Sequence, residues 1–398
     1  MKTTTKSPIL IFSLALLTLA PEGRAQDISR QKIIVFKNKN LTAEQKQSLL
    51  EQAGGEALFA VDSINAVVGY FPYGMDKSLA KSSLVGSVED DAYVKLMPTF
   101  TGSDPRGEPG EDMPWGVASV WAPDVWGLAE GNGVKVCVVD SGIDREHFDL
   151  KANIAGGKNF WDDPSNPGDD YQDELGHGTH VTGIIAASRN NLGLVGVAPQ
   201  SFIYVSKVFG PQGFTSISRI IAGVDYCISV GAQVVNMSLG TYDDFEAFHA
   251  VIRKAYDQGV VLVAAAGNSS IFGVAFPAAY PEVISVAALD ENNQPAWFSS
   301  RGERVDLIAP GVDVPSTYPP GSYRGLSGTS MASPHVAGIA ALFLSYRPGT
   351  DSRDVKHILK STAIRLDGVS PFIQGAGVTN AYRTLLMIKR EERRGAIN

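Results

Sequence analysis

Cysteine, charge and long apolar runs are scarce in this chain of 398 residues. Only two cysteines, Cys137 and Cys227, are present, so no disulfide framework holds the fold; we expect buried free thiols, with a single disulfide left open. Charged residues make up 19% of the sequence and hydrophobic residues 44%, which is typical of a globular protein. The net charge of −8 argues against nucleic acid or an anionic membrane as the partner.

The N-terminus carries an apolar run with the pattern of a secretory signal. Residues 8–20 are apolar and follow Lys2 and Lys6, and small residues stand at Gly23 and Ala25. The run is too short to span a bilayer comfortably. We therefore predict a signal peptide over residues 1–25 and an exported protein without a stable membrane anchor, with an uncleaved anchor as the alternative.

A small separate unit is predicted over residues 26–100. Apolar stretches predict its strands, and a capping pattern at Thr42 and Gln45 predicts a helix start; the strands are expected at 32–36, 65–71 and 88–96, and the helices at 42–52 and 75–84. This order suggests a ferredoxin-like α+β fold. Residues 101–113 follow as a linker rich in Pro, Gly and charge, which is typical of exposed, easily cut chain.

Predicted strands and helices alternate over residues 114–387. The strands are expected at 134–139, 201–208, 234–237, 260–265, 283–287 and 305–309, and the helices at 179–187, 216–230, 245–258, after Ser330 and after Asp351. Such alternation indicates the α/β class, a parallel sheet flanked by helices. Ligands of these sheets bind at the carboxyl ends of the strands. Residues 388–398 are expected as a charged, frayed tail.

Ser330 stands at the start of the most apolar of these helices. Gly328 and Thr329 precede it, and the small and apolar run 332–344 follows at helical spacing. The first N–H groups of a helix lack partners and carry the positive end of its dipole. A hydroxyl beside such an anion site suits a nucleophile in acyl transfer. The alternative is an ordinary N-cap serine before a core helix.

Three more polar residues lie at strand–helix junctions. Asp140 ends the first predicted strand, His177 opens a helix, and Asn268 ends the strand that starts at residue 260. Alone, Asp140 and Asn268 could each be turn residues. Together with Ser330 they form a catalytic set, in which His177 takes the serine proton and Asp140 orients the imidazole. The Asn268 amide and the Ser330 N–H would hold the oxyanion.

Two other enzyme classes use some of the same residue types. His177 and His180 share a helix face and could bind zinc, but no third His or Cys is suitably placed and HExxH is absent. His180 and His335 are therefore expected to be structural, hydrogen-bonded histidines. A lipase or esterase is disfavoured because Gly-x-Ser-x-Gly is absent around Ser330 and the order of the three residues differs.

Four motifs of the chain resemble those of the subtilisin-like serine proteases. They lie at residues 138–144, 176–181, 265–268 and 328–335, and the order Asp, His, Ser is the order of that family. The resemblance covers roughly residues 114–386, and more loosely 32–97. Phe148 and Thr182 stand where the family usually has Pro and Ala, and neither touches the proposed chemistry.

The resemblance implies a groove that binds substrate as an extended strand between two protein segments. The residues that would form its walls are Gly213, Phe214 and Thr215 on one side and Ser238, Leu239 and Gly240 on the other. Ala265 and Gly267 would bound the pocket for the residue before the cut. These walls are small and uncharged, which favours broad specificity with an apolar preference over the dibasic preference of a kexin-like enzyme.

The resemblance also implies a structural calcium site and no catalytic metal. Its ligands would be side-chain oxygens of Asp149 and Asn190 and carbonyls of Ser188, Leu192 and Leu194, with Glu111 as a further candidate, because calcium prefers several oxygens. The alternative is a solvated Asn-Gly turn. The acidic run 162–174 is expected to be a solvated loop, with another calcium site as its alternative.

Residues 26–100 would, by this resemblance, be an intramolecular chaperone and inhibitor. Their tail, ending near residues 96–100, would lie in the substrate cleft until Ser330 cuts it. The predicted protein is a secreted, monomeric serine endopeptidase that is made as a self-processing zymogen and cuts proteins or peptides through an acyl-enzyme. A catalytically inactive binding or scaffold protein on the same fold is the alternative.

Overall fold

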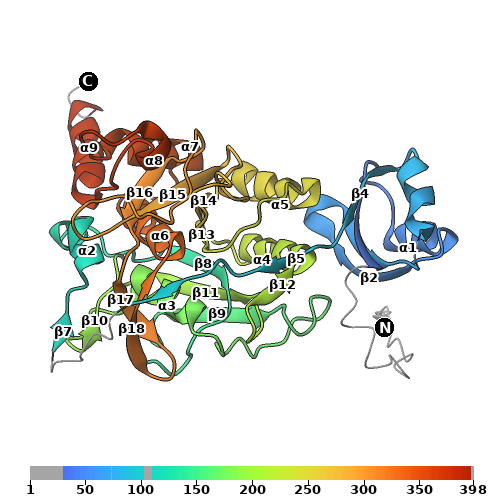
Figure 1. Cartoon of the computed structure of the whole chain (residues 1–398), viewed down its shortest axis with the longest axis horizontal. Helices are drawn as coiled ribbons and strands as arrows, with labels where there is room; N and C mark the ends of the chain where they lie inside the picture. Colours follow the sequence, from blue (N-terminus) through green and yellow to red (C-terminus); the bar gives the residue numbers. More distant parts are fainter. Residues whose placement is uncertain (1–29, 73, 103–109, 396–398) are drawn as a thin grey trace, which may run out of the picture.

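A computed structural model describes residues 30–72, 74–102 and 110–395. It has a large α/β body and a small lobe at one end, drawn in blue in Figure 1. The predicted signal peptide, residues 1–25, lies outside the described residues. Within the described part of the chain, none of the helices has the length and apolar character needed to cross a membrane.

The body is built on a seven-stranded sheet in the order β16-β15-β14-β13-β8-β11-β9. All its neighbours pair in parallel, as the sequence predicted. The strands are β8 (Lys135–Asp140), β9 (Ile154–Asn159), β11 (Phe202–Lys207), β13 (Val234–Met237), β14 (Val261–Ala265), β15 (Val283–Leu289) and β16 (Leu307–Pro310). Strand β9 was not predicted, because its sequence Ile-Ala-Gly-Gly-Lys-Asn has little β-propensity.

Helices cover both faces of this sheet. The longer ones are α3 (His177–Ala186), α4 (Ile217–Ser229), α5 (Glu246–Asp257), α6 (Thr329–Tyr346), α7 (Ser352–Thr362) and α9 (Ala381–Gly395), and the short ones are α2 (Trp115–Ser119) and α8 (Pro371–Gln374). Side chains alternate across β8, so that Val136 and Val138 join the core under α3 and α6, whereas Val139 joins the core under α4 and α5. Helix α9 continues past residue 388, where a frayed tail was expected.

The small lobe has the predicted α+β character. Its strands β1 (Gln31–Phe36), β2 (Glu56–Val61), β3 (Ala66–Tyr70) and β4 (Val85–Asp90) form an antiparallel sheet in the order β2-β3-β1-β4. Helix α1 (Ala43–Gln52) begins with the predicted capping box of Thr42 and Gln45. The predicted second helix is a 3₁₀-helix, Met75–Lys81, and β2 was missed between the two predicted strands.

After β4 the chain crosses the body. Strand β5 (Tyr93–Lys95) pairs with β12 (Phe214–Ser216), and β6 (Phe100–Thr101) joins the hairpin of β17 (Val314–Tyr318) and β18 (Ser322–Ser327). Strand β7 (Glu111–Asp112) then pairs with β10 (Gly193–Leu194). The predicted linker, residues 101–113, is therefore paired with strands of the body at both of its ends. Residues 103–109, between these ends, are outside the described part of the chain.

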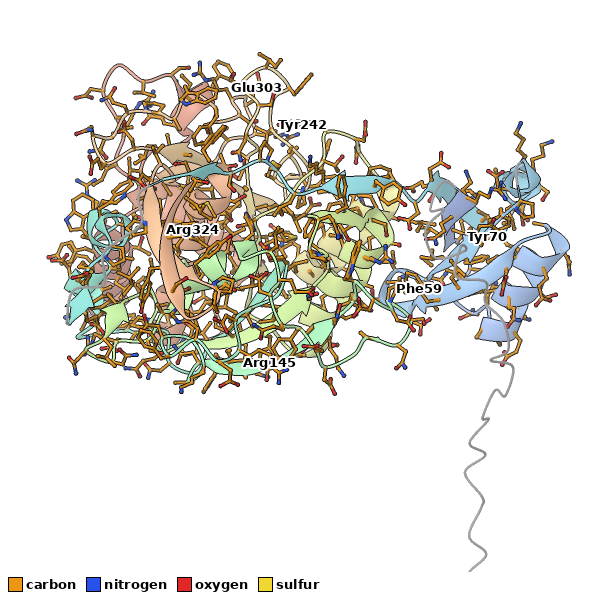
Figure 2. The ribbon with its side chains drawn as sticks, turned by 60° about the horizontal axis from the view of Figure 1, so that its bottom comes forward. Phe59, Tyr70, Arg145, Tyr242, Glu303 and Arg324 are labelled. Carbon is orange, nitrogen blue, oxygen red and sulfur yellow. A yellow bond between two sulfur atoms is a disulfide. The ribbon has the colours of Figure 1, made fainter. Side chains whose placement is uncertain are left out.

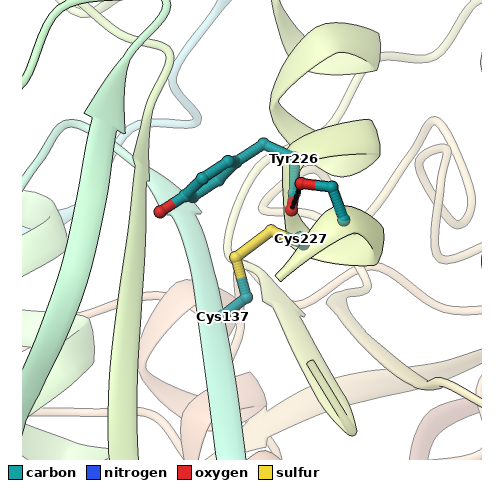
Figure 3. Close-up of a disulfide and its surroundings, with 4 residues drawn as sticks. Cys137, Tyr226 and Cys227 are labelled. Carbon is teal, nitrogen blue, oxygen red and sulfur yellow. Dashed lines mark hydrogen bonds between the residues drawn. A yellow bond between two sulfur atoms is a disulfide. The ribbon is translucent and has the colours of Figure 1, made fainter. Parts of the chain in front are cut away.

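Cys137 and Cys227 form a disulfide (Figure 3). The expectation of free thiols is wrong. Cys137 lies in β8 and Cys227 in α4, and packing of the helix on the sheet brings their Cα atoms to 5.7 Å, inside the range that a disulfide requires. Strand and helix are 90 residues apart in sequence, so the pairing could not be read from spacing.

Removing this disulfide should destabilise the protein. Closing a loop of this length restricts the unfolded chain, and the chain-entropy model gives about 4 to 5 kcal/mol. We expect Cys137→Ser with Cys227→Ser to lower the midpoint of urea unfolding, measured in chains that also carry Ser330→Ala, the predicted nucleophile. The control is Ser330→Ala alone, and equal midpoints in the two chains would contradict a stabilising role.

Candidate active site

The predicted site residues lie at the carboxyl edge of the parallel sheet. Asp140 is the last residue of β8, His177 the first of α3, and Ser330 the second of α6. Asn268 follows β14 by three residues. Parallel pairing of β8, β13 and β14 aligns their carboxyl ends, and the helices that begin there add the other side chains.

Asp140 and His177 form a buried pair. The distance from His177 Nδ1 to Asp140 Oδ1 is 2.7 Å, and the two side chains are 4% and 0% exposed. The Ser141 N–H also donates to Asp140 Oδ1, at 2.7 Å. Because Asp140 accepts the hydrogen bond from Nδ1–H, the proton of the neutral ring lies on Nδ1 and Nε2 is free to accept a proton. Nε2 has no hydrogen-bond partner among the described residues.

The close approach of α3 to β8 depends on glycine. A Cβ on Gly178 would stand 2.2 Å from the Gly142 carbonyl oxygen. Gly176, which caps the helix, has φ of 94° and packs against the ring of Tyr318, so a side chain there would be both strained and blocked. These two glycines let His177 reach Asp140.

Asp173 was missed as a residue of this site. Its Oδ1 accepts from the Ser141 hydroxyl at 2.9 Å and the Gly176 N–H at 2.8 Å, and its Oδ2 accepts from the N–H and hydroxyl of Thr179. It is buried, which corrects the expectation that the whole acidic run is solvated. An acidic residue just before a predicted helix start was the available signal.

Ser330 is fully buried at the start of α6. Its hydroxyl donates to the Ser238 carbonyl at 3.2 Å, and the Ser238 hydroxyl donates to the Ser330 carbonyl at 2.8 Å. Ser238 was predicted as a groove wall, and these bonds tie it to Ser330. The structure therefore holds Ser330 and His177 at one site edge without a hydrogen bond between them.

Asn268 has a fixed amide orientation. Its Oδ1 accepts from the Thr329 N–H at 2.9 Å and the Thr329 hydroxyl at 2.8 Å. This turns Nδ2 outward, where it donates to the Pro98 carbonyl at 2.9 Å. The side chain therefore presents an N–H to a peptide carbonyl beside Ser330, which is the contact expected of an oxyanion donor.

The predicted groove is filled by the protein's own chain. Strand β5 pairs with β12, and the Leu96 N–H donates to the Gly213 carbonyl at 2.8 Å. The Met97 side chain approaches Gly240 on the opposite wall. In Figure 2 the cyan segment crosses the body between the labelled Tyr242 and Arg324. A cavity of about 260 Å³ remains between this segment and the wall formed by Leu175, His177, Tyr318 and Arg324.

Three of the predicted wall residues have more limited roles. The Leu239 side chain is fully buried in the core under α4 and α5, so Leu239 can offer only its backbone to the groove. Ala265 is buried in β14. Gly267, with φ of 115°, leaves no room for a side chain, because a Cβ there would meet the Ser300 hydroxyl at 2.7 Å.

The predicted calcium loop surrounds Asp149. The buried carboxylate accepts from Asn190 Nδ2 at 3.0 Å, the Leu194 N–H at 3.0 Å and the Tyr323 hydroxyl at 2.7 Å. Burial, and then the bond to Asp149, raise the pKa of the Tyr323 phenol. Glu111 accepts from the N–H groups of Asn190 and the next residue. Among the described residues, no group of three or more His, Cys, Asp or Glu could hold a metal ion.

These features define the class of α/β serine endopeptidases in which Asp, His and Ser follow one another in that order. The model of the subtilase family matches residues 131–377. The chain is 37% identical to Subtilisin E of Bacillus subtilis over 93% of this chain and 94% of that protein. It is 44% identical to Subtilisin of Bacillus pumilus over 68% of this chain and 98% of that protein, and 35% identical to the Thermostable alkaline protease of Halalkalibacterium halodurans over 94% and 97%. The chain belongs to the subtilase family and is a serine endopeptidase of the subtilisin type.

Two histidines near the site are held neutral by the core. His180 Nε2 donates to the Arg324 carbonyl at 2.9 Å, and His335 Nδ1 to the Met331 carbonyl at 2.8 Å, which agrees with the structural role predicted for both. Burial lowers the pKa of His180 to about 3 and that of His335 to about 4. Both imidazoles are therefore uncharged in the folded protein at neutral pH.

This burial should make folding stability fall in mild acid. Each histidine takes up a proton on unfolding once the pH drops below its unfolded pKa of 6.5. The stabilisation is complete above that pH and is lost progressively as the pH falls toward the folded values, at about 1.4 kcal/mol per pH unit for each group. Urea unfolding of Ser330→Ala between pH 7 and pH 5 measures this slope. His335→Gln should make the slope shallower, and an unchanged slope would contradict the assignment.

Proposed function

We propose that the protein is a secreted serine endopeptidase that is made as a self-processing zymogen, with Ser330 as the nucleophile. The observation that carries this proposal is a peptide carbonyl, that of Pro98, held by the Asn268 amide beside Ser330. The Asp140–His177 pair, with Nε2 open, lies at the same edge of the sheet. The proposed nucleophile, the proposed base and the amide N–H that binds this carbonyl therefore all lie at one edge of the sheet.

The groove would bind substrate by strand addition. Strand β12 offers its backbone to an incoming strand, as it does to β5, and main-chain hydrogen bonds of this kind depend little on side chains. The wall opposite is lined by Ser238 and Gly240, and the pocket by Ala265 and Gly267. Small, uncharged walls support broad specificity with a preference for an apolar residue before the cut.

The chemistry follows from the roles of the three polar residues. The Ser330 hydroxyl would rotate from the Ser238 carbonyl toward His177 and lose its proton to Nε2 as Oγ attacks the carbonyl carbon. Asp140 keeps the Nδ1 proton in place and stabilises the imidazolium. The Asn268 amide and the Ser330 N–H hold the oxyanion. His177 then protonates the leaving nitrogen, and water releases the acyl-enzyme.

The N-terminal lobe would act as inhibitor and folding aid. We assign residues 1–25 to a signal peptide, 26–100 to the propeptide, 101–113 to a linker and 114–387 to the catalytic domain of a monomer. Two carboxylates support the propeptide role by binding helix starts of the body: Asp91 accepts from the N–H and hydroxyl of Ser218 in α4, and Glu89 from the Ala247 N–H in α5. The lobe therefore contacts the helices that flank the groove.

The chemistry of the donor set around Asp149 fits calcium. A buried carboxylate, the Asn190 amide oxygen and the carbonyls of Ser188, Leu192 and Leu194 are hard oxygen ligands, and Glu111 already reaches this loop. Asn190 now turns Nδ2 to Asp149, so its amide would have to rotate to offer Oδ1. Bound calcium would stabilise the loop and take no part in the reaction.

Ser330→Ala should abolish both processing and activity. Without the hydroxyl no acyl-enzyme forms, so the exported chain should keep residues 26–398, whereas the wild type loses about its first hundred residues and digests casein. Intact mass and casein turnover measure the two effects. Trimming of Ser330→Ala at the same place would mean that another protease matures the chain. Equal casein turnover by both chains would overturn the nucleophile assignment, and no turnover by either would favour a binding or scaffold protein.

Calcium should stabilise the protein through Asp149. Excess calcium at a hundred times its Kd would add about 2.7 kcal/mol to the free energy of unfolding. We expect the Tm of Ser330→Ala to be higher in excess calcium than in a calcium chelator. Adding Asp149→Asn to this chain should remove that difference. Asp169→Asn, in the exposed acidic loop, is the matched control and should keep it. If Asp169→Asn, and not Asp149→Asn, removed the rise in Tm, the calcium site would lie in the acidic loop and not at Asp149.

A further inference from the structure

The segment 93–101 is attached to the body on both sides of Ser330. On one side β5 pairs with β12, and the Leu96 N–H donates to the Gly213 carbonyl at 2.8 Å. On the other side β6 pairs with β18, with Phe100 opposite Ser327. Only Met97, Pro98 and Thr99 lie between Leu96, which makes the last hydrogen bond to the β12 side, and Phe100, which makes the first pair with β18. One of the peptide bonds around these three residues is therefore the bond presented to Ser330.

Two contacts select different bonds. Met97 lies at the pocket: the residue is 7% exposed, and its Cε lies 3.6 Å from where a Cβ on Gly240 would stand. Gly240 and Gly267 bound the same space, because a Cβ on either would lie 3.0 to 3.4 Å from the Ala275 Cβ. The Asn268 amide binds the carbonyl of the next residue, because its Nδ2 donates to the Pro98 carbonyl at 2.9 Å. A substrate that is cut after its pocket residue would offer the carbonyl of that same residue. The residue at the pocket, Met97, is therefore not the residue whose carbonyl Asn268 binds, which is Pro98. The two differ by one position in the sequence.

We propose that Pro98 causes this mismatch and thereby sets the position and the rate of self-processing. The proposal rests on the function proposed above. The bond after Met97, which the pocket selects, is protected, and the first cut falls slowly after Pro98, leaving a chain that begins at Thr99. With the segment in place, Ser330 is fully buried.

The protection follows from the chemistry of the leaving nitrogen. Attack on the Met97 carbonyl would form the Oγ–C bond and pass the serine proton to His177 Nε2. Breaking the C–N bond then requires that proton to reach the nitrogen of Pro98, which would leave as a secondary amine. This nitrogen carries no N–H, and the ring Cδ occupies that place. The ring crowds the face from which the imidazolium must donate, so the adduct returns to the intact peptide.

Restraint at both ends stops the segment from sliding to correct the mismatch. While the Pro98 ring fixes φ between the two pairings, moving the Met97 carbonyl onto Asn268 would require a one-residue shift of either pairing, which in a strand turns side chains to the opposite face. Without the ring, rotation within residues 97–99 could bring the Met97 carbonyl to Asn268 while both pairings are kept. On the β18 side, Phe100 packs against the rings of Trp297 and Phe298 at 5.2 to 5.4 Å between centroids. That contact opposes the shift.

Self-processing of the refolded full-length chain tests the proposal. Wild type, Pro98→Ala and Thr99→Ala are diluted from urea, quenched over time and analysed by intact mass and N-terminal sequencing. We expect Pro98→Ala to be cut after Met97 and to process about a hundredfold faster, the size of the cost of a misplaced reacting group. Wild type and the matched control Thr99→Ala should be cut slowly, after Pro98. A wild-type cut after Met97, or equal rates and sites in all three chains, would overturn the proposal.

Two further arms separate this proposal from the function on which it rests. Pro98→Ala combined with Ser330→Ala should stay uncut; trimming of that chain would overturn self-processing itself. If processing needs Ser330 but ignores Pro98, only the role of Pro98 fails. A peptide of residues 93–102, added to the matured enzyme, avoids any folding defect of the variant: it should inhibit and be cut slowly after Pro98, whereas its Pro98→Ala form should be cut rapidly after Met97. Equal cleavage of the two peptides at one bond would count against the proposal.

Discussion

Parallel strand pairing is the constraint on which the rest of the structure depends. Because β8, β13 and β14 run in the same direction, their carboxyl ends share one edge, and each connecting helix must begin near that edge. Asp140 and Asn268 come from strand ends, and His177 and Ser330 from helix starts. A sheet of mixed direction would send some of these residues to the opposite edge. The polar site is thus a consequence of topology, built over an apolar core.

Burial then gives the polar groups of the site their properties. Asp140 and His177 are removed from water together, so their hydrogen bond is not in competition with solvent. Asp173 holds the loop before α3 by accepting four hydrogen bonds from Ser141, Gly176 and Thr179. Thr329 fixes the Asn268 amide through both its N–H and its hydroxyl. The imidazole of His177 and the amide of Asn268, which would touch a substrate, are therefore each held by a neighbour that would not.

In the proposed zymogen, one groove would serve two stages in the life of the chain. An extended segment satisfies the free backbone of β12 and β18 and covers Ser330, as a substrate would. Inhibition and substrate binding would therefore use the same main-chain hydrogen bonds. In the proposed mechanism, the two differ in the short stretch from Met97 to Thr99, where the ring of Pro98 replaces an N–H. One residue type would then decide whether the bound strand is retained or cut.

Local patterns in the sequence determined the α/β class, the strands with continuous apolar runs, the capping box of α1 and the junction residues Asp140, His177, Asn268 and Ser330. These features depend on neighbours along the chain, where propensity and periodicity act. The glycine-rich β9, the pairing of Cys137 with Cys227, the burial of Asp173 and the hydroxyl bond of Ser330 were decided by tertiary structure alone. Each depends on partners far away in sequence, and a local pattern carries no information about which distant surface will pack against it.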